Sequence, residues 1–81
     1  MKLAKVSREE LALIIQRRAL EIAASEGYGA EIPLPAVDVL EKPIGAPEVH
    51  WMLSDRQNLR GIAFIWDAAA ELSKEYDVRT D

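Results

Sequence analysis

His50 is the only imidazole in the chain and the first residue to consider for chemistry, because an imidazole titrates near neutral pH. It can act as a general base when a carboxylate orients its ring and a nucleophile lies within hydrogen-bond reach. Four neighbours in the sequence could take these roles, although they follow no known catalytic spacing: Asp38, Glu48, Ser54 and Asp55. Because His50 alternates with apolar residues, we interpret it as a surface residue of a strand.

Metal and cofactor motifs are missing from the sequence. With one histidine and no cysteine, the chain offers no thiolate or histidine-rich metal centre, and its carboxylates do not follow a calcium-loop pattern. It contains no dinucleotide-binding glycine motif, no Walker-type loop and no nucleophile elbow. We therefore expect no metal, no cofactor and no enzymatic activity. The alternative is a small enzyme or ligand-binding protein that uses His50 and nearby carboxylates.

The sharpest departure from a regular pattern is Phe64, which a helical wheel places on the polar side of its helix. Its neighbours on that side are charged: Arg60, Asp67, Glu71 and Glu75. An apolar anchor ringed by carboxylates is typical of a contact surface for a basic partner protein, since aromatic residues supply buried anchors and rim charges steer association. The alternative is that residues 1–6 or the C-terminal tail cover Phe64.

The composition limits the classes of function. Eighty-one residues are enough for one domain, and a hydrophobic content of 49% is typical of a globular protein. The net charge of −4 argues against general nucleic-acid binding, which needs clustered lysine and arginine. No apolar run approaches the ~20 residues that span a bilayer. The first residues become acidic instead of forming an apolar signal core, so we expect a cytoplasmic protein.

The first helix is predicted over residues 7–26. Ser7 and the glutamate three residues later form a capping box, and Gly27 supplies the left-handed residue that ends many helices. Beside its main apolar face the helix carries a second apolar row, in which Leu13 and Leu20 lie one heptad apart. This row either packs inside the domain or forms the seam of a homodimer.

A β-hairpin is predicted next. Residues 36–41 and 49–53 alternate apolar and polar side chains, as half-buried strands do. The segment between them contains two prolines and a glycine and predicts a wide loop. Residues 1–6 are either a short edge strand or a frayed lead-in, and residues 77–81 are expected to form a tail.

The second helix is predicted over residues 55–76, with Ser54 as its N-cap. The wheel places a broad apolar arc that includes Trp66 against the core, with charged residues opposite. Eight residues are predicted to lie in one core: Leu11, Ile15, Ile22, Val39, Trp51, Leu53, Ile62 and Trp66.

These elements predict a single α+β domain, residues 1–81, in which two amphipathic helices pack on one face of an antiparallel hairpin in the order α-β-β-α. A lone hairpin leaves strand edges open, so a second copy of the chain could complete the sheet. The function expected is a small, acidic, non-enzymatic protein-interaction module or regulator that binds a basic partner around Phe64. The sequence leaves the partner, the biological process and the oligomeric state open.

Overall fold

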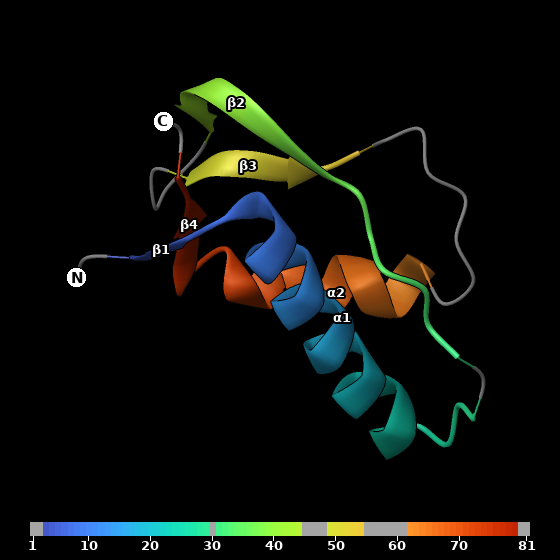
Figure 1. Ribbon diagram of the computed structural model, residues 1–81. Coiled ribbons are helices and arrows are strands. Elements are labelled where there is room, and N and C mark those ends of the chain that lie inside the picture. The colour runs from blue at the N-terminus through green and yellow to red at the C-terminus, as the bar shows by residue number, and fades with distance from the viewer. Residues whose placement is uncertain (1–2, 30, 45–48, 55–61, 80–81) are drawn as a thin grey trace.

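The computed structural model describes residues 3–29, 31–44, 49–54 and 62–79. Two helices lie against one side of an antiparallel hairpin, and two short terminal strands lie side by side near one end of that hairpin (Figure 1). The expected α+β fold is confirmed. The elements are β1 (Ala4–Val6), α1 (Arg8–Ser25), β2 (Val37–Ile44), β3 (Val49–Leu53), α2 (Ile62–Leu72) and β4 (Tyr76–Val78).

Helix α1 begins and ends as its sequence predicts. The Ser7 hydroxyl accepts a hydrogen bond from the Glu10 N–H at 3.1 Å, which satisfies one of the free donors of the first turn. After Ser25 the chain passes through Gly27 at φ 78°, a left-handed conformation that glycine adopts without steric cost. The face that includes Leu11 and Ile15 is fully buried and forms much of the core.

The hairpin is confirmed, with a register break that the sequence does not reveal. Val37 lies opposite Leu53 and Val39 opposite Trp51, but the next pair in the ladder is Ile44 with Val49. Three more residues of β2 than of β3 separate these last two pairs, so the backbone of β2 bulges after Val39. The residue of β3 that lies opposite this break is His50.

The two ends of the chain form a parallel pair of strands. In this pair Ala4 lies opposite Tyr76 and Val6 opposite Val78. The edge strand considered for residues 1–6 is therefore present, but the prediction of a C-terminal tail is wrong. Strands of three residues carry too little alternation to be seen in a sequence, and their pairing joins residues more than seventy positions apart.

Helix α2 is shorter than predicted, and its buried face is different. Of the predicted range 55–76, residues 55–61 lie outside the described part; the helix ends at Leu72 and the strand β4 begins at Tyr76. The residues buried along it are Ile65, Ala68, Ala69 and Leu72, whereas Trp66 is 47% exposed. The core position predicted for Trp66 is wrong. Apolar side chains cover more than half of this helix, so the wheel alone does not decide which part is buried.

The other seven residues predicted to lie in the core differ in how deeply they are buried. Trp51 is buried, as are three other members of the predicted set, Leu11, Ile15 and Leu53. Ile22 and Ile62 are half-buried against the same core, but Val39 is exposed. Val39 lies on the core side of the hairpin at the start of the bulge, where its side chain is not covered. No helix among the described residues is long and apolar enough to cross a membrane.

Candidate functional site

The chain places its imidazole against a buried carboxylate. Asp77 in β4 is 3% exposed, and its Oδ2 lies 3.0 Å from Nδ1 of His50 in β3. Its Oδ1 accepts hydrogen bonds from the backbone N–H groups of His50 at 2.7 Å and of Val78 at 2.9 Å. An ionised carboxylate can only accept, so Nδ1 of His50 carries the proton that it shares with Asp77.

The register break in the hairpin explains why this pair forms. Opposite the break the ladder between β2 and β3 is interrupted, and the N–H of His50 bonds to Asp77 instead. The described parts of β3 and β4 form no ladder with each other, although they lie in contact. A second side-chain bond joins them, from the indole Nε1 of Trp51 to the Tyr76 carbonyl at 3.1 Å.

The pKa of Asp77 is held below its ordinary value of 3.8. Burial on its own raises the pKa, because it disfavours the charged form. The bonds from the His50 backbone, the His50 ring and the Val78 backbone favour the charged form and together outweigh burial. Asp77 is therefore a charged group that is satisfied inside the fold.

This geometry leaves Nε2 of His50 able to accept a proton, which is the arrangement of a histidine oriented by an acid. No hydroxyl or amine of the described residues is hydrogen-bonded to the ring. No group of three or more potential metal ligands occurs in the described part of the chain. The enzyme alternative drew its partners for His50 from nearby residues; of these Asp38 is exposed, Ser54 is half-buried, and Glu48 and Asp55 lie outside the described residues. The carboxylate that binds the ring is 27 residues away, and no local pattern signals it.

Phe64 is half-buried, and an aromatic ring from the segment that follows α1 lies against it. The centroids of the Tyr28 and Phe64 rings are 5.0 Å apart and the planes are tilted by 50°. Tilted pairs at this separation are favourable because the positive edge of one ring meets the negative face of the other. Tyr28 was in neither of the two segments expected to cover Phe64.

The acidic row near Phe64 is partly neutralised within the chain. Arg18 of α1 contacts Glu71 at 2.9 Å and its own-helix neighbour Glu21 at 2.8 Å. Asp67 and Glu75 are exposed and form no ion pair with the described residues. Arg60, the basic member of the predicted site, lies outside the described part.

The outer side of α2 carries a surface that the sequence did not predict. It consists of Ala63, Trp66, Asp67 and Ala70, which are all exposed, and we call it the Trp66 face. The small side chains of Ala63 and Ala70 lie about one turn to either side of the indole. The signal that could have revealed it is the apolar content of the helix, which exceeds what one buried face requires.

Leu13 and Leu20 are 51% and 42% exposed on the outer side of α1. They are therefore not packed inside the domain, and the homodimer seam stays a prediction.

Comparisons with protein families, curated proteins and solved structures find no match to this chain.

Proposed function

We propose that the chain is a non-enzymatic protein-interaction module that binds a basic segment of another protein on the Trp66 face of α2. The proposal is carried by one observation, that Trp66 is 47% exposed on a helix whose isoleucines and leucine are buried or half-buried. Tryptophan is enriched at the centres of interfaces because it removes a large apolar area from water on binding. Ala63 and Ala70 leave room beside the indole for a partner side chain.

The charge around this face supports a basic partner. Asp67 on this face is an exposed carboxylate without an ion pair among the described residues, whereas Arg18 already neutralises Glu71. Glu75, also exposed, lies in the turn after the end of α2. The chain carries a net charge of −4, which attracts a cationic segment during the encounter. A lysine or arginine of the partner can also lie over the face of the Trp66 ring. The anchor is thus Trp66, whereas Phe64 packs against Tyr28 within the chain.

The test is a calorimetric titration with a helical peptide that has leucines on one face and lysines on the other. Replacing Trp66 with alanine should weaken binding by about 30-fold, since loss of a central anchor costs about 2 kcal/mol or more. Asp67→Lys should also weaken peptide binding relative to the wild type, and should make the affinity less dependent on salt. Met52→Ala is the matched control, an exposed apolar residue on the hairpin, and should change nothing. Equal affinity for wild type and the Trp66 variant would refute the proposal.

The second candidate is a small enzyme or ligand-binding protein, and the His50–Asp77 pair is the observation that favours it. A ring oriented at 3.0 Å by a buried carboxylate can accelerate proton transfer if a substrate reaches Nε2. Hydrolysis of an activated ester tests this role. A rate above that of free imidazole, lost in both His50→Gln and Asp77→Asn, would favour the enzyme over the interaction module.

A further inference from the structure

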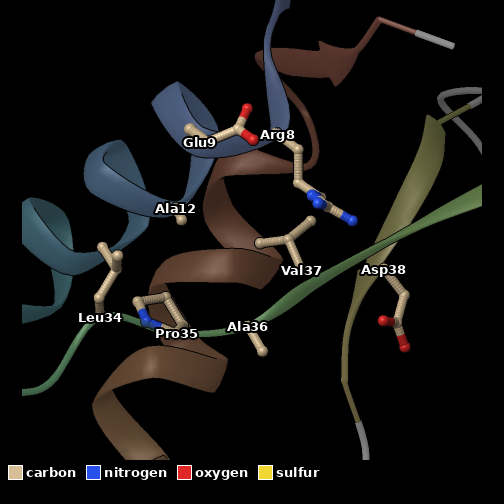
Figure 2. A pocket seen from close by; sticks show the side chains of 8 residues that line it. All are labelled: Arg8, Glu9, Ala12, Leu34, Pro35, Ala36, Val37 and Asp38. Atoms are coloured by element: carbon tan, nitrogen blue, oxygen red, sulfur yellow. The ribbon is translucent and has the colours of Figure 1, made fainter.

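A groove of about 350 Å³ lies between the first turns of α1 and the segment that leads into β2. Figure 2 shows the side chains of Arg8 and Val37 converging on it from the helix and the strand, while Asp38 points to the other side of the strand. The apolar part of its lining includes Ala12, Leu34 and Val37. Leu34 is 51% exposed, so its apolar side chain remains available for contact.

The edge of β2 beside this groove has no neighbouring strand among the described residues. The N–H of Ser54 donates to the carbonyl of Ala36 at 3.1 Å, which fixes the phase of the ladder. In an antiparallel pair, successive residues direct their backbone N–H and C=O groups alternately toward and away from the partner strand. The N–H and C=O groups of Val37 and Val39 therefore point away from β3. Val37 lines the groove and no residue of β3 does, so the groove adjoins β2 where the backbone groups of Val37 point away from β3. Val39, two residues further along β2, has an exposed side chain.

Arg8, Glu9 and Asp38 are the charged residues that line the groove. The guanidinium group of Arg8 extends toward β2, whereas the carboxylate of Glu9 stays beside the first turn of α1 and that of Asp38 points to the other side of the strand (Figure 2), so Arg8 supplies the charge on the side of the groove next to β2. Its side chain is exposed and forms no ion pair with any carboxylate of the described residues. A guanidinium group donates two parallel hydrogen bonds to a carboxylate, which selects a negatively charged partner group and fixes its position. The bulge after Val39 and the missing N–H of Pro43 limit strand addition at this edge to a few residues.

We propose that this groove binds a short extended segment of another protein that carries an acidic side chain. The segment adds to the outer edge of β2 at Val37 and Val39, and its carboxylate binds Arg8. An alternate side chain of the segment lies in the groove against Ala12 and Leu34, as in other cases of strand addition. This surface is separate from the Trp66 face and takes a partner of opposite charge.

The test is an NMR titration with a capped five-residue peptide of alternating valine and glutamate, and with a matched peptide in which lysine replaces glutamate. The glutamate peptide should shift the amide signals of Arg8, Ala12 and the stretch from Val37 to Val39, with a dissociation constant near or below about 1 mM. Arg8→Glu should weaken it by about tenfold or more, since a bond between charged groups is lost. Arg17→Glu, an equal charge change on the exposed side of the same helix, should have little effect.

Methylation of the central amide of the peptide should also weaken binding, because strand addition needs that N–H. Equal binding of the lysine peptide, an equal effect of the Arg8 and Arg17 variants, or no shifts from Val37 to Val39 would each overturn the proposal. Trp66→Ala should leave binding of the glutamate peptide unchanged. The groove and the Trp66 face can therefore fail independently of each other.

Discussion

The carboxylate of Asp77 bonds to both the backbone and the ring of His50, at 2.7 and 3.0 Å, and so takes the place of a ladder between β3 and β4. A buried charge is tolerated only when its acceptor sites are satisfied. Three bonds to Asp77 provide this, and the two that come from His50 also fasten the paired strands of the two chain ends to the hairpin.

Asp77→Asn should lower the free energy of unfolding by about 2–3 kcal/mol. The amide keeps one acceptor oxygen, but its NH₂ group is bonded only if the His50 ring changes tautomer, and the charge that strengthens the bonds is lost. Urea unfolding measures the change. Asp67→Asn removes a carboxylate that is exposed and should cost less than about 0.5 kcal/mol. Similar losses for the two variants would show that the bonds to Asp77 add little to stability.

Stability should fall at acid pH partly through Asp77. Its pKa in the folded protein is lower than the ordinary value of 3.8, so its contribution is present above that value. As the pH falls below 3.8 and through the folded pKa, the unfolded chain binds the proton first and the contribution is lost. Comparing the pH dependence of unfolding for wild type and Asp77→Asn isolates this effect. Superimposable slopes below pH 3.8 would contradict it.

The two tryptophans should respond differently to truncation. Trp51 is buried and its indole donates to the Tyr76 carbonyl, so Trp51→Ala should cost about 3–5 kcal/mol. Trp66→Ala should cost less than about 1 kcal/mol, because half of the indole is already in water. Thermal unfolding of both variants decides the matter. A large loss for Trp66 would show that its exposed indole is part of the core.

The homodimer that is one of the two alternatives for the apolar row of α1 has its candidate seam in Leu13 and Leu20, which are exposed on the same side of the helix. Light scattering at micromolar concentration should then give twice the mass of one chain, and Leu20→Asp should give a folded monomer. Leu34→Asp, at another exposed leucine outside the helix, is the matched control and should keep the dimer. A wild-type protein with the mass of one chain would rule out the seam.

The parts of the fold that follow from the sequence are those with strong local signals. Ser7 and Gly27 mark the limits of α1, and alternation marks both strands of the hairpin. The chemistry of Asp77 could not be predicted in this way. A register break in the hairpin leaves His50 free to bond to Asp77. The strand that contains Asp77 forms only by pairing with the other end of the chain.

The surface of α2 was predicted only in part, for a related reason. The partner site predicted around Phe64, with Asp67, Glu71 and Glu75, stays a prediction, whereas the buried side of α2 differs from the predicted one: Trp66 is exposed and Phe64 is half-buried. The packing partners decide which side is buried: Tyr28 lies against Phe64, and Arg18 reaches Glu71. Neither contact can be read from the pattern of α2 itself.

The most direct test of the account is the fluorescence of the Trp51→Phe variant, in which Trp66 is the only indole. Before addition of the leucine–lysine peptide, emission should be that of a solvent-exposed tryptophan, because Trp66 is 47% exposed. Binding should move the emission to shorter wavelength and protect it from a soluble quencher, with saturation as peptide is added. An emission spectrum and a quenching constant that stay unchanged through the titration would contradict the proposal that the Trp66 face binds a basic partner.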